Sequence, residues 1–260
     1  MSKVLKYILT GIGCGLLAAC FIVAYSAGQA GRKPLVCKGV AVTVKDSSEN
    51  CFVTKADVKT FISKGYGQVV GMKLDSIDLH RIEQIVDGRS AVLKSEAFVT
   101  KDGMLNVHVT QRKPIVRFQK KDGGFYADAE GCIFPLQNSY SSHVQIIDGN
   151  IPLKANSGHK GMIEDPAELE WFRRVMDVVN FMENDKLWKN KIVQIHVDDD
   201  GGLVLIPREG RERFLIGQPC MIEEKFSKME KYYSYIAPSR EEGHYRSVDL
   251  RFKGQIVCRK

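Results

Sequence analysis

The feature that most constrains this chain is an uncharged, largely apolar run near its start. No charged residue occurs over residues 7–30, which are rich in leucine, isoleucine, alanine and glycine. A helix needs about 20 mostly apolar residues to cross roughly 30 Å of hydrocarbon. Lys3 and Lys6 precede the run, and positive charge there favours a cytoplasmic N-terminus. We therefore predict a cytoplasmic tail over residues 1–6, a transmembrane helix over residues 7–30, and the bulk of the chain outside the cytoplasm.

Two other interpretations of this run stay open. Ala24-Tyr25-Ser26 would serve as a signal-peptide cleavage site, although the apolar part of a signal peptide is typically only about 7–15 residues long. Leu17-Ala18-Ala19-Cys20 resembles the lipidation signal of bacterial lipoproteins. Against it, the residues after Cys20 are apolar, where a lipid-anchored protein would begin a polar tether. A retained anchor fits the length and the flanks of the run better than cleavage or lipidation does.

Length and charge narrow the class of the remaining chain. With 260 residues, the protein can hold one large domain or two small ones. The formal net charge is +7, from 38 basic and 31 acidic residues, but the excess is spread along the chain. Proteins that bind nucleic acid usually collect such charge in a stripe or an arm. Nucleic-acid binding is therefore disfavoured.

The region directly after the run predicts a small α+β unit. Residues 40–44 are β-branched and alanine residues typical of a strand, and Thr54 with Asp57 forms a capping box that opens a helix. A second helix follows Asp78 as its N-cap, and residues 95–109 form a hairpin around an Asp-Gly turn. The expected order is strand, helix, helix, strand, strand. Two helices on one face of a three-stranded sheet make a compact domain, which we place at residues 36–113.

The remainder, residues 114–260, is richer in strands. Residues 125–136 predict two short strands around a Glu-Gly turn, and residues 192–207 predict a hairpin across an aspartate-glycine turn. One helix is expected after Asp165 with Pro166 in its first position, and another over residues 221–235. This pattern predicts a mixed β-sheet domain with two helices.

The join between the two regions is the segment NVHVTQRKPIVRFQ, residues 106–119. It alternates as a half-buried strand does, is interrupted by Pro114, and then resumes alternation at once. Proline lacks a backbone donor and marks a strand break or an edge. We interpret the segment as the last strand of one domain running directly into the first strand of the next, which would fix the relative orientation of the two domains.

The sequence offers no constellation for catalysis. No phosphate-binding loop, nucleophile motif or metalloprotease helix is present, and His108 and His196 fall on the polar side of predicted strands. The aspartates at 198–200 lack the spacing of a calcium loop and suit a hairpin turn. We predict no catalytic residue, no cofactor and no metal ion.

The cysteines leave the redox pattern open. None of the seven belongs to a Cys-x-x-Cys pair, and five lie outside the apolar run: Cys37, Cys51, Cys132, Cys220 and Cys258. An odd number leaves at least one free or paired between chains. Cys37 and Cys51 flank a predicted strand and could meet.

Taken in order, these elements resemble a known family. A strand–helix–helix–strand–strand unit directly after a single membrane span is similar to a POTRA domain. Three further pieces resemble the bacterial cell-division family FtsQ/DivIB: the basic-proline join at 111–114, the hairpin at 126–134, and the terminal strand at 248–252. The resemblance extends over about residues 36–257, and the tail before the run is short for the family.

The resemblance implies a non-enzymatic, bitopic scaffold of the division septum in the inner membrane. Such a scaffold engages the small division proteins FtsB and FtsL and, through them, the septal peptidoglycan synthase. The family receives FtsB as a strand added to its last strand. Carried over by position, that edge would comprise Arg251, Phe252, Gly254, Gln255, Ile256 and Val257. The other possibility is that the last strand merely completes the sheet, since every sheet has edges.

Two other functional classes also contain POTRA domains or act in the cell envelope. An outer-membrane transporter with a POTRA domain needs many alternating strands for its barrel, and this chain has no room for them. A secreted or lipid-anchored enzyme acting on peptidoglycan, with the POTRA unit as a docking module, would need a nucleophile or a metal cluster. Release of fragments from isolated cell walls would reveal such an activity.

Overall fold

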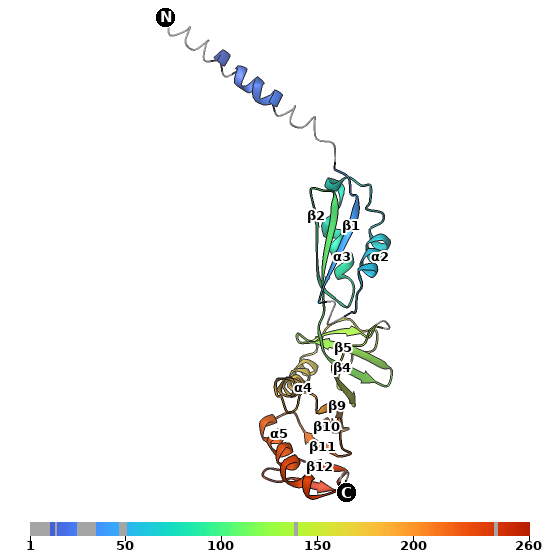
Figure 1. Ribbon diagram of the computed structural model, residues 1–260, viewed down its shortest axis with the longest axis vertical. Helices are drawn as coiled ribbons and strands as arrows, with labels where there is room; N and C mark the ends of the chain where they lie inside the picture. Colours follow the sequence, from blue (N-terminus) through green and yellow to red (C-terminus); the bar gives the residue numbers. More distant parts are fainter. Residues whose placement is uncertain (1–10, 14, 25–34, 47–50, 138–139, 242–243) are drawn as a thin grey trace, which may run out of the picture.

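The chain folds into two β-sheets that follow one another along the long axis of the molecule, from the N-terminal to the C-terminal end (Figure 1). The computed structural model describes residues 11–13, 15–24, 35–46, 51–137, 140–241 and 244–260. Of the predicted membrane segments, the tail at 1–6 and parts of the helix at 7–30 lie outside these residues, and the described parts of 11–24 are helical. Among the described residues, no helix has the length and apolar character needed to cross a membrane.

The first sheet has three strands in the order β1-β3-β2, with β1 parallel and β2 antiparallel to β3. Its elements are β1 (Gly39–Lys45), α2 (Lys55–Gly65), a 3-10 turn (Leu74–Ser76), α3 (Leu79–Asp87), β2 (Val92–Val99) and β3 (Met104–Gln111). The predicted order of strand, helix, helix, strand, strand is confirmed.

Local sequence chemistry sets the two helices of this sheet. The Thr54 hydroxyl accepts from Asp57 N at 3.2 Å, while Thr54 N donates to the Asp57 carboxylate at 2.9 Å, which completes the predicted capping box. Asp78 caps α3 by accepting from Arg81 N at 3.0 Å. Each helix buries one apolar stripe, and alternate residues of β3 are buried against them. The core of this unit thus lies between the helices and one face of the sheet.

The second sheet has ten strands in the order β13-β12-β11-β10-β9-β7-β4-β5-β6-β8. Its strands are β4 (Pro114–Lys120), β5 (Gly123–Asp128), β6 (Cys132–Pro135), β7 (Gln145–Gly149), β8 (Gly161–Met162), β9 (Ile192–Val197), β10 (Leu203–Pro207), β11 (Arg213–Gly217), β12 (Ser247–Asp249) and β13 (Val257–Arg259). The helices are α4 (Pro166–Asn184) and α5 (Ile222–Lys231), and a π turn (Tyr232–Ile236) and a 3-10 turn (Ala237–Ser239) follow α5. Parallel pairs β4–β7, β7–β9 and β11–β12 make the sheet mixed, so the predicted α+β class holds.

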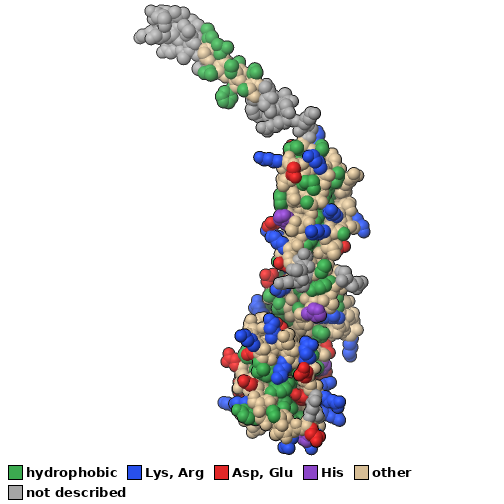
Figure 2. Space-filling view, in the orientation of Figure 1, with side chains coloured by type: hydrophobic (Ala, Val, Ile, Leu, Met, Phe, Trp, Pro, Cys, Tyr) green, Lys and Arg blue, Asp and Glu red, His purple; other side chains and the backbone are tan. Residues whose placement is uncertain are grey.

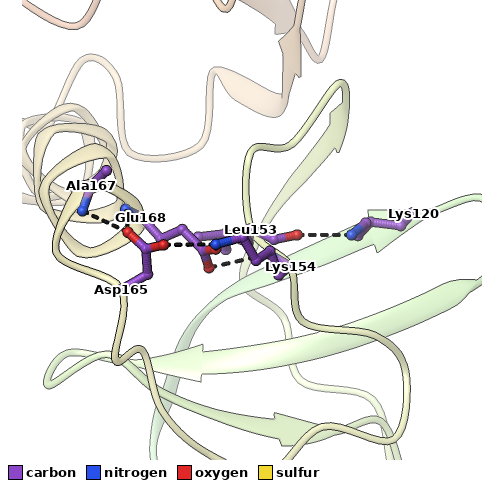
Figure 3. Close-up of polar contacts among 6 residues, drawn as sticks. All are labelled: Lys120, Leu153, Lys154, Asp165, Ala167 and Glu168. Atoms are coloured by element: carbon purple, nitrogen blue, oxygen red, sulfur yellow. Dashed lines mark hydrogen bonds and ion pairs between the residues drawn. The ribbon is translucent and has the colours of Figure 1, made fainter.

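An irregular segment between β7 and α4 is tied to both the sheet and the helix (Figure 3). Lys120 of β4 donates to the carbonyl of Leu153 at 2.9 Å. Lys154 pairs with Asp165 at 2.7 Å and with Glu168 at 3.4 Å. Asp165, the predicted N-cap of α4, also accepts from Ala167 N at 2.9 Å. These contacts hold the start of α4 against the sheet.

The join between the sheets is continuous, as predicted. β3 ends at Gln111 and β4 begins at Pro114, the first position of a strand, where a missing N–H is tolerated. Arg112 N donates to Ala91 O at 2.9 Å, and its guanidinium pairs with Asp128 at 2.9 Å. The side-chain oxygen of Gln111 accepts from Val53 N at 2.8 Å. Arg112 therefore contacts both sheets.

A cluster of rings packs across this join. Phe52, 4% exposed, precedes α2 and lies edge-on to Tyr126, Phe134 and Tyr140 of the second region, with centroid distances of 5.4, 5.9 and 4.9 Å. We call these four residues the junction cluster. Because Tyr126 and Phe134 are buried within the first unit's core, the two sheets share part of one core. The two domains are thus joined by packing as well as by chain continuity.

Candidate functional site

The candidate site is the free edge of the ten-stranded sheet formed by β13. Among the described residues, β13 pairs on one side only, antiparallel with β12, through Ser247 with Arg259, Val248 with Cys258 and Asp249 with Val257. The carbonyl of Arg259 accepts from Arg246 N at 2.8 Å and so faces inward. Since successive residues of a strand point their backbone groups to opposite sides, the N–H and C=O of Cys258 face the free edge.

A buried lysine fixes the turn that leads into β13. Lys228 of α5 is only 7% exposed, and its ammonium donates to the carbonyls of Leu250 at 3.3 Å and Phe252 at 2.8 Å. The same ammonium pairs with Glu224 at 2.8 Å and lowers the pKa of that carboxylate. The carbonyls of the turn are therefore hydrogen-bonded to a side chain of α5.

A buried carboxylate organises the start of the same turn. Asp249, 1% exposed, accepts from the guanidinium of Arg251 at 2.9 and 2.8 Å and from Arg251 N at 3.2 Å. The Arg251 side chain holds the pKa of Asp249 below its usual value, against the opposing effect of burial. Arg259 of β13 lies 3.9 Å from the same carboxylate. Asp249 thus links β12, the turn and the edge strand.

These contacts revise which residues form the edge. Of the six residues that the sequence assigned to it, only Val257 lies in β13, while Arg251, Phe252, Gly254, Gln255 and Ile256 lie in the loop before it. The predicted strand at 248–252 likewise ends at Asp249. The physical reason is that Arg251 folds back onto Asp249, Lys228 occupies the carbonyls of Leu250 and Phe252, and Gly254 turns the chain with φ +69°. The edge strand is Val257–Arg259 instead.

A second polar group, His196 with Asp148, lies beside the turn that follows β9, where His196 Nε2 is also 3.9 Å from Asp198 Oδ1. His196 Nδ1 lies 2.8 Å from Asp148 Oδ1, between strands β9 and β7, and Gln194 donates to the same carboxylate at 2.7 Å. His196 is therefore paired as well as partly exposed. In the described part of the chain, none of the hydrogen bonds of this pair goes to a serine, threonine or cysteine. The arrangement is a cross-strand polar pair.

The described residues offer neither a metal site nor a disulfide bond. Among the described residues, no group of three or more His, Cys, Asp or Glu side chains could hold a metal ion. All six described cysteines are free thiols, so Cys37 and Cys51 are not bonded to each other; Cys37 is buried and Cys51 is exposed. Burial raises the pKa of the Cys132 thiol and of the Cys258 thiol.

Comparison with known families accounts for both regions. The family model described as a POTRA-like domain matches residues 35–110, and the model described as FtsQ/DivIB, C-terminal related, matches residues 113–259. The second match alone spans more than half of the 260 residues. The chain belongs to the FtsQ/DivIB family. Among curated proteins, no match to the chain was found. The FtsQ/DivIB domains point to a division-related scaffold rather than to an enzyme.

Proposed function

We propose that this FtsQ/DivIB protein is a non-enzymatic, membrane-anchored scaffold of the bacterial divisome. The uncharged run at 7–30 holds it in the inner membrane, with residues 1–6 in the cytoplasm and the two folded domains outside it at the septum. The domains bind FtsB- and FtsL-type partners and, through them, the septal peptidoglycan synthase. The elongated arrangement supports this role, because the β13 end lies far from the N-terminal segment (Figure 1).

The observation that carries the proposal is the free edge of β13. An unpaired edge offers backbone donors and acceptors, so a partner strand gains a ladder of hydrogen bonds, and alternate side chains select the partner. The chain that leads into the edge is held in place before any partner arrives, because Asp249 and Lys228 both bind the first residues of the turn. Because the edge is already ordered, less conformational entropy is lost when a partner binds.

The chemistry of the partner-facing surface follows from the same residues. Phe252 is 47% exposed at the turn, which gives an apolar contact next to the edge. Arg251 and Arg259 expose parts of their guanidinium groups beside Asp249, and their charge favours a partner segment with acidic residues. The proposed site therefore combines backbone pairing through Cys258, an apolar anchor and a basic flank.

In-cell photo-crosslinking tests this proposal. A photoreactive amino acid at Val257 or Arg259 of the full chain should capture a small single-span division protein, identified by mass spectrometry. The matched control is Met162, 49% exposed on β8 at the opposite edge of the same sheet, which should capture no such protein. Absence of capture at both edge positions, or equal capture at Met162, would contradict β13 as the partner site. Capture of an unrelated envelope protein would contradict the division role.

A further inference from the structure

We propose that the tip of the POTRA domain is a docking surface for an anionic lipid bilayer, a role that rests on the proposed membrane anchoring. Three loops meet at this tip: the chain entering β1 (residues 35–38), the loop after α2 (residues 68–73) and the turn between β2 and β3 (residues 101–103). It is the end of the domain from which the chain continues toward the N-terminus (Figure 1).

Backbone hydrogen bonds make the tip a defined surface. Cys37 N donates to Met72 O at 2.8 Å, and Gly71 N donates back to Cys37 O at 2.8 Å. Leu74 N donates to Leu35 O at 2.9 Å, and Lys38 N donates to Gly103 O at 2.8 Å. These bonds tie the first loop to both of the others. The backbone of the three loops is thus held in a defined arrangement, from which the side chains at the tip project.

Three apolar side chains are exposed at the tip. Leu35, Val36 and Val70 have exposed fractions of 52%, 43% and 46%, although their loops are hydrogen-bonded together. Hydrophobic atoms are visible at this end of the domain in Figure 2, with lysine and arginine atoms around them. Amphipathic surfaces of this kind lie in the interface of a bilayer, where their apolar side chains enter the boundary between headgroups and acyl chains.

The charges at the tip complement anionic headgroups. Lys38, Lys73 and Lys101 are exposed, and none of them forms an ion pair within the described residues. Asp102 lies in the turn between β2 and β3, and Asp75 lies in the 3-10 turn just after the second loop, so these two acids and the three lysines together carry one surplus positive charge. In the sequence, Arg32 and Lys33, separated from Leu35 only by Pro34, add two more. Basic residues near an anionic membrane surface are attracted within about a Debye length, roughly 8–10 Å.

The short connection between the uncharged run and the tip favours a lipid surface over a distant partner as the ligand of the tip. Gly31 is the last residue before the charges that end the uncharged run, and Leu35 follows it by four positions. Even fully extended, four residues span only about 14 Å. If the run crosses the bilayer, the tip is held within reach of the headgroups, and a surface too weak to bind membranes from solution would bind at this high effective concentration. The proposal therefore commits to the bilayer as the occupant.

The experiment uses the purified full chain in nanodiscs whose lipids carry brominated acyl chains. A fluorescent amino acid replaces Val70 at the tip or, as a reference position, Met162 in the second sheet, and quenching by the bromines reports contact with the membrane. Discs of phosphatidylcholine with phosphatidylglycerol should quench the label at position 70 several-fold more than the label at 162. Discs of phosphatidylcholine alone should quench the label at position 70 less than the mixed discs do. Added salt should reduce this difference between the two kinds of disc.

Charge variants separate the surface from the anchor. Replacing Lys38, Lys73 and Lys101 by glutamine should lower the docking equilibrium constant by roughly fivefold per lysine. The matched control replaces Lys45, Lys55 and Lys94, at the other end of the domain, and should leave quenching unchanged. Equal quenching at positions 70 and 162 in chains that float with the discs would overturn the tip proposal alone. Chains that do not float with the discs at all would overturn both the anchor and the tip.

Discussion

Replacing Phe52 by alanine should uncouple the two sheets without unfolding either. The ring is 4% exposed and contacts Tyr126, Phe134 and Tyr140 of the second region. Truncating a buried phenylalanine costs about 3–5 kcal/mol. Domains are typically stable by about 5–15 kcal/mol, so the variant should remain folded at low temperature. Because the lost contacts cross the junction, the cost should fall on the coupling between the sheets.

Two optical probes resolve the sheets in urea. Trp171 and Trp188 are the two tryptophans of the chain, and both lie in the second region, so their fluorescence reports that sheet alone. Far-ultraviolet circular dichroism reports both sheets. In the wild type the two probes should give coincident transitions. In Phe52→Ala the first sheet should unfold earlier by at least about 1 M urea, given a slope of about 1–3 kcal/mol per molar.

A matched substitution controls for the loss of an aromatic ring. Phe98 of β2 is 40% exposed and lies outside the junction cluster, so Phe98→Ala should keep the probes coincident and shift the midpoint little. If Phe52→Ala left both probes coincident with the wild-type midpoint, the junction cluster would not couple the domains, and the packing argument would be refuted.

Three further predictions concern the second sheet. In Asp249→Asn the fold should lose a stabilisation that the wild type has in full above the unfolded aspartate pKa of about 3.9. Because Arg251 lowers the folded pKa of Asp249, the wild-type advantage in urea midpoint should shrink progressively as the pH falls below that value and through the folded pKa. Lys228→Met keeps the buried stem but removes the donor to Leu250 and Phe252, so amides of the turn should exchange faster by mass spectrometry while the dichroism spectrum stays unchanged. Gly149→Ala places a side chain at φ +91° against the Val197 carbonyl and should lower the free energy of unfolding by more than about 1–2 kcal/mol, whereas a wild-type urea midpoint would contradict the strain.

Local signals in the sequence predicted most elements of the fold. The capping box at Thr54, the cap at Asp165 and the turn at Gly103 each depend on chemistry within a few residues, and the structure confirms all three. The strand break at Pro114 was predictable in the same way, because it depends on the missing backbone donor of a single residue. Such elements are predictable because the interactions that set them involve neighbours in the chain.

Interactions between distant residues could not be predicted in this way. The edge, which was assigned from the family resemblance, was placed several residues too early, and nothing in the local sequence reveals that Lys228 donates to the carbonyls of Leu250 and Phe252. The junction cluster was missed for the same reason: Phe52 meets Tyr140 across 88 positions of sequence.

The most direct test of the account is amide hydrogen exchange of β13 in the full chain, with and without a purified FtsB-type partner. The Cys258 amide faces the free edge, so pairing with a partner strand should slow its exchange by at least tenfold, while amides of β8 at the other edge keep their rates. Cys258→Pro, which removes that donor, should weaken partner binding. If the partner binds and the exchange of residues 257–259 is unchanged, β13 is not the acceptor strand and the proposed mechanism is wrong.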